Sequence, residues 1–438
     1  MTHTIFALAT GAGRSAIAIV RISGAETLAA LMALTGGSAP APREARFTRF
    51  YAPETRELLD EGVAIWRPGP RSPTGEDYAE LHIHGGRAVI DACLSALARL
   101  SGLRPAEPGD FIRRGFVNGK VDLSQAEALA DLIDAQTEFQ RRQAVRIASG
   151  AFRHRVGAWR EALLRALAMV ESELDFSDEG DVEDISRAAL EALLRPLAAE
   201  FAQALADAPA SERLRDGFLV LILGPPNAGK STLMNALARR DVAIVSEIAG
   251  TTRDMIELHL DIGGAPVTLV DTAGLRRARD AIEKIGIERT RDRIADADLL
   301  LWLSEGGREP PPPDVLAQAG GSEILALATK ADIAAASSGV LALSAATGVG
   351  LESLCEAIAA RALARMGDGS SALVIRERHR RCLAAAAEDI RAARRDLLSL
   401  ELVAEHLRLA SRALAEIVGA IDVEQVLDEI FSRFCIGK

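Results

Sequence analysis

The clearest chemical signature in this 438-residue sequence is a glycine-rich segment, LVLILGPPNAGKST, that begins as an apolar run. It contains Gly224-x-x-x-x-Gly229-Lys230-Ser231, the spacing of a phosphate-binding loop between a strand and a helix. In such a loop, backbone N–H groups surround the phosphates and the helix N-terminus adds partial positive charge. We therefore expect Lys230 to reach the β- and γ-phosphates of a nucleotide and Ser231 to offer its hydroxyl to Mg²⁺.

Four further segments follow this loop in order: GTTRD (250–254), DTAG (271–274), TKAD (329–332) and SAA (344–346). Thr252 can supply a second Mg²⁺ ligand, Asp271 can hold Mg²⁺ through water, and the Gly274 N–H can sense the γ-phosphate. Asp332 can accept hydrogen bonds from the guanine N1–H and 2-amino group, and SAA can reach guanine O6. Adenine presents no such donor pair, so the ordered set predicts GTP.

The nucleotide-binding residues predicted in this way form five groups along the chain. They are Asn227, Ala228, Gly229, Lys230, Ser231 and Thr232; Ser246, Glu247, Ile248, Ala249, Gly250, Thr251 and Thr252; Asp271, Thr272, Ala273 and Gly274; Thr329, Lys330 and Asp332; and Ser344, Ala345 and Ala346.

Two positions depart from the usual GTPase pattern. Thr329 stands where asparagine commonly braces the base-binding loop; threonine keeps a hydroxyl but loses the amide, and we expect guanine specificity to survive. Leu275 stands near the place where Ras-type enzymes use glutamine to orient the attacking water. Either hydrolysis is very slow, or other groups position the water. Asn227, whose amide oxygen can bind a monovalent cation, and Glu283, which is otherwise a solvated helix residue, are the candidates.

The pattern of apolar residues indicates the elements that position these groups. Residues 1–118 alternate short apolar runs with Gly/Pro-rich turns, which is typical of an α+β domain. Residues 119–210 and 372–438 have helical periodicity, with a predicted capping box at Asp122 and Gln125 and helical texture at 187–207. Between them, residues 216–366 alternate buried strands with helices. We predict a Ras-like α/β P-loop GTPase domain inserted into a discontinuous α-helical domain.

Composition limits the classes of partner and compartment. The net charge of −11 argues against a protein that coats nucleic acid without selectivity. Four scattered cysteines without a Cys-x-x-Cys pair favour a reducing, cytoplasmic setting. No apolar run of about 18 residues is present, so we expect no membrane span. Residues 371–395 hold seven arginines against three acids, which suits either a nucleic-acid-contacting face or an ordinary exposed helix.

The sequence ends in FCIGK. Cys435 is the fourth residue from the end, which is where the cysteine of a prenylation signal stands. Gly437 and Lys438 fit the last two positions of a prenylation signal poorly, and no polybasic segment precedes the cysteine. The tail instead follows an apolar helical stripe made of Val423, Val426, Leu427, Ile430, Phe431 and Phe434. We expect this helix to dock the tail, where Cys435 either packs or acts as a nucleophile or proton carrier.

With these residues in hand, the chain resembles the MnmE (TrmE) family of GTPases, which modify the wobble uridine of certain tRNAs. The resemblance covers essentially the whole chain. It rests on VRISG, GPRSPTGEDYAELHIHGG, PGDFIRRGFVNGKVDLSQAEALADLIDA, GPPNAGKSTLMNALA, AIVSEIAGTTRD, DTAGLR with EKIGIER, and the terminal FCIGK. It implies an N-terminal domain that binds a tetrahydrofolate one-carbon donor and forms a homodimer, a helical domain, and a K⁺-activated G domain.

The resemblance also implies roles for individual residues. In the family K⁺ lies beside the P-loop asparagine, which implicates Asn227, Ser246, the carbonyl of Ile248, and Thr251, with the site completed where the G domains of a dimer meet. The family's catalytic glutamate aligns with Glu283. Together with Lys230 and Cys435, Asn227 and Glu283 form the predicted catalytic set.

A folate site is implied at Arg21, Glu80, Lys120 and Lys438, for a 5-formyl- or methylene-tetrahydrofolate. Arginine and lysine suit the carboxylates of the folate tail, and a glutamate can accept the N–H donors of the pterin ring. Glu80 would share one face of a strand with His82 and His84. Their His-x-His spacing also allows a metal site, although no further ligand is evident nearby.

Three functions remain open at this stage. In the first, GTP hydrolysis drives G-domain dimerisation and a conformational change. With the family's FAD-dependent partner MnmG, in an expected heterotetramer, the chain then installs an aminomethyl or carboxymethylaminomethyl group at C5 of wobble uridine 34. The second is an RNA-binding ribosome-assembly GTPase without folate chemistry, although the KH domain or tandem G domains of such proteins are not evident. The third is a stand-alone folate enzyme with a regulatory G domain.

Overall fold

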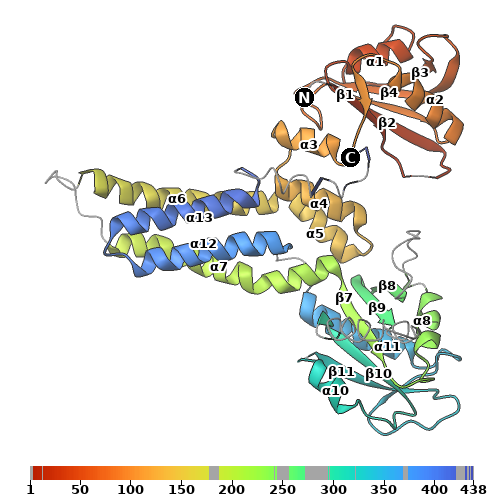
Figure 1. Ribbon diagram of the computed structural model, residues 1–438, viewed down its shortest axis with the longest axis vertical. Helices are drawn as coiled ribbons and strands as arrows, with labels where there is room; N and C mark the ends of the chain where they lie inside the picture. The colour runs from red at the N-terminus through yellow and green to blue at the C-terminus, as the bar shows by residue number, and fades with distance from the viewer. Residues whose placement is uncertain are drawn as a thin grey trace, which may run out of the picture. The chain divides into compact units, whose positions relative to one another are not determined.

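The structure is a computed structural model (Figure 1) that describes residues 3–11, 13–176, 187–240, 242–243, 256–271, 294, 296–320, 322–367, 373–420, 430–431, 434 and 436–437. Contacts within the chain divide it into two compact units. One unit comprises Met1–Ala130, Arg153–Arg160 and Ser411–Lys438, and the other comprises Asp131–Phe152 and Glu161–Ala410. Each unit has its own sheet and its own apolar core.

The sheet of the first unit has the strand order β3-β4-β5-β2-β1-β6. Its strands are β1 (Thr4–Leu8), β2 (Ile17–Ser23), β3 (Ala45–Tyr51), β4 (Leu58–Arg67), β5 (Tyr78–His84) and β6 (Leu103–Pro105). The pairing is antiparallel except between β1 and β6. Alternate strand residues such as Val20, Ile22, Leu81 and Ile83 form a core with helices α1 (Thr27–Leu34) and α2 (Arg87–Ala98). The residues between them therefore lie on the opposite face of the sheet.

A second, smaller core in this unit joins residues near the C-terminus to residues 112–130. Phe431 and Phe434 pack with Leu123 and Ala126 of α4 (Leu123–Asp134) and beside α3 (Asp110–Val117). The predicted capping box starts α4, because the Gln125 N–H donates to Asp122 Oδ1 at 2.9 Å and Asp122 N–H donates to Gln125 Oε1 at 3.1 Å. Residues 421–429 of the predicted last helix lie outside the described residues.

The second unit combines long helices with an α/β sheet. Its long helices are α5 (Glu138–Ala148), α7 (Arg187–Asp216), α12 (Glu377–Arg395) and most of α6 (Ala151–Phe176) and α13 (Leu400–Ile417). Helix α7 continues past the predicted end at residue 207, through Pro209, to Asp216. Ion pairs join helices from before and after the α/β segment: Arg394 to Glu191 at 2.6 Å, and Arg408 to Glu171 at 2.9 Å. The prediction of a discontinuous helical domain is confirmed.

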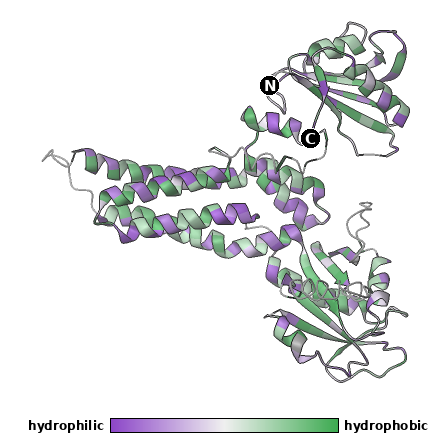
Figure 2. Cartoon of the chain, viewed as in Figure 1, coloured by the Kyte–Doolittle hydropathy of each residue, from purple (hydrophilic) through white to green (hydrophobic). Residues whose placement is uncertain are grey.

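The α/β segment forms a sheet of order β12-β11-β10-β7-β9-β8, parallel except for β8. Its elements are β7 (Phe218–Leu223), α8 (Lys230–Ala238), β8 (Ile256–Ile262), β9 (Ala265–Asp271), β10 (Leu299–Glu305), α10 (Pro313–Gln318), β11 (Glu323–Thr329), β12 (Leu341–Ala342) and α11 (Leu351–Met366). Figure 2 shows these strands as hydrophobic along most of their length, as strands covered on both faces should be. The predicted α/β P-loop fold is confirmed. Within the described ranges, no helix is long and apolar enough to cross a membrane.

Candidate functional site

The phosphate-binding loop follows β7 and ends at Gly229, which precedes α8 with φ of 93°. Asn227 also has a positive φ, of 61°, and successive backbone N–H groups in such conformations can form a concave anion site. The Lys230 ammonium donates to the carbonyls of Gly224 (2.9 Å) and Pro225 (2.8 Å), so the lysine folds back over its own loop. Ala228 is buried in the core and anchors the loop to the sheet.

A hydroxyl and a carboxylate meet beside this loop. The Ser231 hydroxyl, in the first turn of α8, donates to Asp271 Oδ2 at 3.0 Å. Asp271 ends β9, where the sheet register pairs it with Ile222 of β7, and it is only 2% exposed. Oxygen ligands of this kind are those that Mg²⁺ prefers, so the two residues fit the predicted metal. Together with the backbone of the loop they can bind the phosphates of a nucleotide.

The two predicted base-binding segments are joined by the backbone. Ala331 N–H, after β11, donates to the Leu343 carbonyl after β12 at 3.1 Å. This bond brings the TKAD segment, with Asp332, next to the SAA segment that begins at Ser344. Because both segments follow the carboxyl ends of adjacent parallel strands, they lie at the edge of the sheet where α/β folds bind ligands.

Thr329 has a structural role that explains its departure from asparagine. Its side chain is buried, and its hydroxyl donates to the Ser304 carbonyl on neighbouring β10 at 3.2 Å. The next residue, Lys330, has φ of 58° and pairs with Glu305 Oε2 at 2.7 Å. The end of β11 is thus fastened to the end of β10.

Several predicted site residues lie outside the described residues. They are Ser246, Glu247, Ile248, Ala249, Gly250, Thr251, Thr252, Thr272, Ala273, Gly274 and Glu283 of the α/β segment, and Cys435 and Lys438 of the tail. Among the predicted K⁺ ligands, Asn227 alone falls within the described ranges. The catalytic role of Glu283 and the role of Cys435 therefore stay predictions.

A polar cluster lies on the face of the first sheet that is opposite α1 and α2. The register places Arg21 of β2 directly across from Glu80 of β5, with Arg21 Nε 3.7 Å from Glu80 Oε1. The Tyr78 hydroxyl donates to the same oxygen at 3.0 Å, and His82 Nε2 lies 3.4 Å from Glu80 Oε2. The structure therefore brings Arg21 and Glu80 together, as the predicted folate site requires.

The C-terminal tail reaches this cluster. Arg21 Nη1 donates to the Gly437 carbonyl at 3.1 Å, and Ile436 forms an antiparallel bridge with Pro108. Gly437 has φ of 94°, and a Cβ there would collide with the Leu8 carbonyl oxygen, so only glycine fits this close approach. Residues at opposite ends of the sequence thus contribute to one site.

The chemistry of the cluster suits a ligand with both N–H donors and carboxylates. Within the described part of the chain, the buried Arg21 Nε has no hydrogen-bond partner, which leaves a donor available to an anionic group. Glu80 offers carboxylate oxygens on a side chain that is 13% exposed. Lys120 is exposed and lies beside Gly75, where an added Cβ would stand 3.2 Å from Lys120 Cε.

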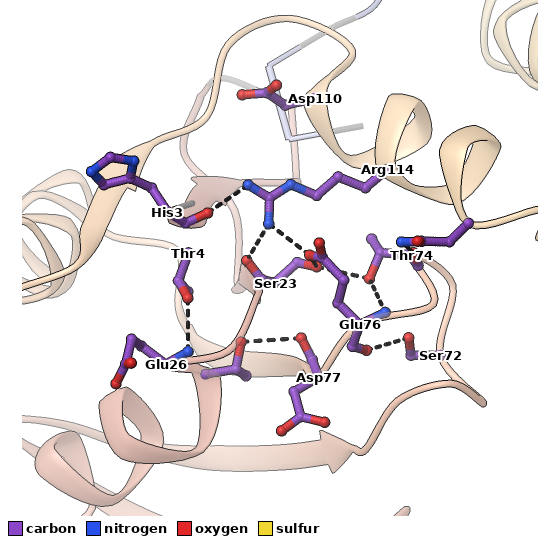
Figure 3. Close-up of polar contacts among 12 residues, drawn as sticks. His3, Thr4, Ser23, Glu26, Ser72, Thr74, Glu76, Asp77, Asp110 and Arg114 are labelled. Atoms are coloured by element: carbon purple, nitrogen blue, oxygen red, sulfur yellow. Dashed lines mark hydrogen bonds and ion pairs between the residues drawn. The ribbon is translucent and has the colours of Figure 1, made fainter. Parts of the chain in front are cut away.

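Sequence reasoning missed a buried arginine that supports this cluster (Figure 3). Arg114 of α3 is 2% exposed, and its guanidinium donates to Glu76 Oε2 (2.6 Å), the Ser23 carbonyl (3.0 Å) and the His3 carbonyl (2.7 Å). Ser23 Oγ in turn lies 2.7 Å from Thr74 Oγ1. Arg114 thereby fastens the loop before β5 to the end of β2 and to the residue that precedes β1.

One signal in the sequence could have identified Arg114. It lies three residues after Phe111, and both residues are on the buried side of α3. An arginine at an apolar position of a short amphipathic helix must find carboxylate and carbonyl partners, because an unpaired buried charge is costly. Glu76 of PTGED is the carboxylate partner, although its distance along the chain hides this pairing in the sequence.

The two histidines of HIH pair with carboxylates. His82 lies beside Glu80, whereas His84 donates its backbone N–H to Asp60 Oδ2 at 2.7 Å and places Nδ1 2.8 Å from Asp60 Oδ1. Burial alone would raise the pKa of Asp60, but these hydrogen bonds hold it below its usual value. Among the residues that the structure describes, no group of three or more His, Cys, Asp or Glu could hold a metal ion.

Arginines in and just before α12 contact carboxylates of other helices. Arg376, just before the helix, lies 2.6 Å from Asp131, and Arg394 pairs with Glu191 of α7. These pairs hold the helical segments together and offset much of the positive charge that suggested a tRNA-contacting face.

Comparisons with known proteins agree along the whole chain. A family model described as the GTP-binding protein TrmE N-terminus matches residues 4–120, and one described as the MnmE helical domain matches residues 123–435. A protein of Beijerinckia indica subsp. indica, named tRNA modification GTPase MnmE, is 51% identical over 438 residues, which cover 100% of this chain and 96% of that protein. A protein of the same name from Methylobacterium sp. (strain 4-46) is 52% identical over 449 residues, with 100% of both chains covered.

Among solved structures, the G domain of the T. maritima FeoB iron transporter matches 33% of this chain and 98% of its own, at 24% identity and a TM-score of 0.24.

Proposed function

The chain belongs to the MnmE family of tRNA modification GTPases, and we propose that it is a K⁺-activated GTPase that modifies the wobble uridine of tRNA with a folate-derived one-carbon unit. Its activity as a GTP hydrolase in tRNA modification follows from that membership. The finer proposal is carried by one observation: the tail places the Gly437 carbonyl on Arg21, beside Glu80. A GTPase that acted only as an RNA-binding switch would have no need for this second polar site.

In the nucleotide site, Ser231 and Thr252 would hold Mg²⁺, with Asp271 acting through water, and Lys230 would leave its two carbonyl partners to reach the phosphates. Asp332 and Ser344 read the guanine base. We assign K⁺ to Asn227 with Ser246, Ile248 and Thr251, and water positioning to Glu283. A cation at this place would neutralise charge that develops between the phosphates during hydrolysis.

In the second site, Glu80 would accept N–H donors of the pterin ring, and Arg21 would lie at the same end of the ligand because the two side chains are 3.7 Å apart. Lys120 and Lys438 add positive charge for the glutamate tail. The tetrahydrofolate derivative, 5-formyl- or methylene-tetrahydrofolate, supplies the one-carbon unit. Cys435 is positioned two residues from Gly437 and is therefore near this site along the chain.

We propose that the partners are a second copy of the chain, an FAD-dependent MnmG protein in a heterotetramer, and tRNA, and that the chain works in the cytoplasm. The product is an aminomethyl or carboxymethylaminomethyl group at C5 of uridine 34. GTP hydrolysis would drive G-domain dimerisation and the conformational change that accompanies this reaction.

Nucleoside analysis of tRNA tests the proposal most directly. A deletion strain is complemented with the unaltered gene, with Ser231→Ala or with Glu80→Gln, and the modified wobble uridine is measured by mass spectrometry. We expect the unaltered gene to restore the modification and both variants to fail, while purified Glu80→Gln still hydrolyses GTP. Full modification by Glu80→Gln would exclude the folate assignment, and equal GTPase rates in K⁺ and Na⁺ buffers would exclude K⁺ activation.

A further inference from the structure

We propose that Tyr78 is a positioning residue of the N-terminal site: its hydroxyl fixes the carboxylate of Glu80 in the orientation that accepts the paired N–H donors of a pteridine ring. This inference rests on the proposed folate function and adds a residue to it. Tyr78 touches the Glu80 carboxylate rather than the reacting carbon, so its effect on the ligand acts through that carboxylate.

The contact between the two side chains is direct and shielded from water. Tyr78 and Glu80 lie two residues apart on β5, so both side chains stand on the same face of the sheet. The hydroxyl donates to Glu80 Oε1 at 3.0 Å, and Tyr78 as a whole is 3% exposed. A hydrogen bond from a neutral donor to a charged acceptor is stronger than one between two neutral groups.

The tyrosine is itself held in place by packing. Its ring meets that of Phe111 edge to face, with centroids 6.4 Å apart and an interplanar angle of 84°. As the first residue of β5, Tyr78 pairs in register with Ser23, whose carbonyl accepts from buried Arg114. The Arg114 contacts thus fix the start of the strand from which Tyr78 projects.

Tyr78 remains a donor throughout the physiological pH range. Burial raises the pKa of its hydroxyl well above the usual value, and the neighbouring Glu80 carboxylate acts in the same direction. The hydroxyl therefore stays protonated, so Tyr78 remains the hydrogen-bond donor and the Glu80 carboxylate remains the acceptor. Charged groups on adjacent strands, Arg21 on β2 and Arg67 on β4, oppose this shift without reversing it.

The second oxygen of the carboxylate has its own neighbour. His82 Nε2 lies 3.4 Å from Glu80 Oε2, and Arg21 Nε lies 3.7 Å from Oε1. With Tyr78 at the shorter distance, rotation of the carboxylate about its last bond would break the best of these contacts. A fixed carboxylate plane favours a ligand that presents two parallel donors, as the ring N–H and the 2-amino group of a pterin do.

The test is calorimetric titration of the full chain with 5-formyltetrahydrofolate. We compare the unaltered chain with Tyr78→Phe, Glu80→Gln and the double variant. Tyr51→Phe is the matched control, because Tyr51 is the chain's other tyrosine and lies on the edge strand β3. We expect Tyr78→Phe to weaken binding by about tenfold, the usual effect of losing a hydrogen bond to a charged group. The control should change binding by less than about twofold.

The double variant separates positioning from a general structural effect. If Tyr78 acts through Glu80, adding Tyr78→Phe to Glu80→Gln should weaken binding by less than about twofold. A second measurement uses an analogue of the ligand that lacks the 2-amino group. Tyr78→Phe should reduce the preference for the complete ligand over this analogue, whereas a distorted site would lose affinity for both equally. Unaltered hydrogen exchange in β2 and β5 of the N-terminal unit confirms that each variant is folded.

The outcomes are distinct. Unchanged binding by Tyr78→Phe, or a full tenfold effect that persists in the Glu80→Gln background, would overturn the inference while leaving the folate site intact. A loss of affinity with an unchanged preference between the two ligands would also overturn it. Absence of binding by the unaltered chain would refute the proposed folate function and this inference together.

Discussion

The two sites of the molecule are held together over very different lengths of chain. In the nucleotide site, Lys230 contacts carbonyls five and six residues away, and Ser231 contacts Asp271 forty residues on. In the N-terminal site, Arg21 contacts Gly437 across 416 residues. The phosphate-binding part of the first site is therefore a property of one loop and two adjacent strands, whereas the second site exists only when the two ends of the chain are folded together.

The sites also differ in what supplies their polar groups. The phosphate loop offers backbone N–H groups, which any sequence with the right glycines provides. The N-terminal site depends on charged side chains, among them the partly buried Arg21 and Glu80, on strands whose ends are fastened by Arg114, itself 2% exposed. Removing a side chain should thus impair GTP hydrolysis in the nucleotide site, and should disrupt the local folding of the N-terminal site.

The largest effect should follow from Arg114→Ala. This change removes the donor to two backbone carbonyls and leaves the Glu76 carboxylate to its hydrogen bond from Ser23 Oγ, and breaking a buried pair costs about 3–5 kcal/mol. We expect the loss to be confined to the N-terminal unit. Hydrogen exchange measured by mass spectrometry should show faster exchange in β2 and β5 but unchanged protection in β7 and β10.

Arg87→Ala is the matched control for that experiment. Arg87 lies in the same unit, but its side chain is 95% exposed and pairs with Asp91 at 3.7 Å. An exposed ion pair of this kind contributes roughly 0.5 kcal/mol or less, so exchange should be unaffected. Equal protection in the two variants would show that the Arg114 contacts do not support β5.

The same difference explains what could be predicted from sequence. The loop at Gly229 and Lys230 was identified from spacing alone, because its function depends on neighbours along the chain. The capping box at Asp122 and Gln125 was likewise found, since both partners lie within one turn. Contacts between residues that are close in sequence can be predicted from a short motif, and the structure adds their distances.

Contacts that span the fold could not be derived in this way. Nothing in the spacing of Arg21 and Glu80 indicates that they are directly opposite in the sheet, and they were identified through family resemblance. The helix α7 continues through Pro209 to Asp216, beyond the predicted segment 187–207, and buries Ala208, Ser211 and Leu214 in that continuation. Arg114 was missed because its partners lie at three separate places in the chain.

The second largest effect is expected for Ser231→Ala, which tests the nucleotide site as Arg114→Ala tests the N-terminal site. Loss of the hydroxyl beside Asp271 removes a ligand of the predicted Mg²⁺, and loss of one group that stabilises the transition state lowers kcat on the order of a hundredfold. Phosphate release under single turnover measures the change. Ser231→Thr, which keeps the hydroxyl, should hydrolyse GTP within about threefold of the unaltered rate.

Hydrogen exchange in the N-terminal unit should be unaltered in Ser231→Ala. If GTP hydrolysis by this variant were normal, the Ser231–Asp271 pair would not be the Mg²⁺ site. If hydrogen exchange in β5 increased instead, the stability of the N-terminal site would depend on the nucleotide site. That result would contradict the view that the two sites are stabilised independently.

A smaller effect is expected for Gly437→Ala, which tests whether the tail completes the N-terminal site. The added Cβ would meet the Leu8 carbonyl, and the φ of 94° disfavours any residue with a Cβ by roughly 1–2 kcal/mol. We expect the tail to leave Arg21 and folate binding to weaken about tenfold. Gly367→Ala is the control, because Gly367 also has a positive φ but an added Cβ there would meet nothing within 4 Å. Unchanged folate binding by Gly437→Ala would show that the tail is not part of the site.

The smallest effect is expected at Thr329. The sequence separation of its hydrogen bond is intermediate between the short-range contacts of the phosphate loop and the Arg21–Gly437 contact. Its hydroxyl reaches Ser304 across 25 residues but only to the next strand of the same sheet. Thr329→Val keeps the shape and removes the donor, which costs roughly 1 kcal/mol for a buried neutral hydrogen bond and so weakens GDP binding about fivefold. Titration with a fluorescent GDP analogue measures this, and Thr329→Ser should bind normally because it retains the hydroxyl. Equal affinity of the valine variant would mean that backbone contacts such as Ala331 to Leu343 are enough to hold the base-binding loop.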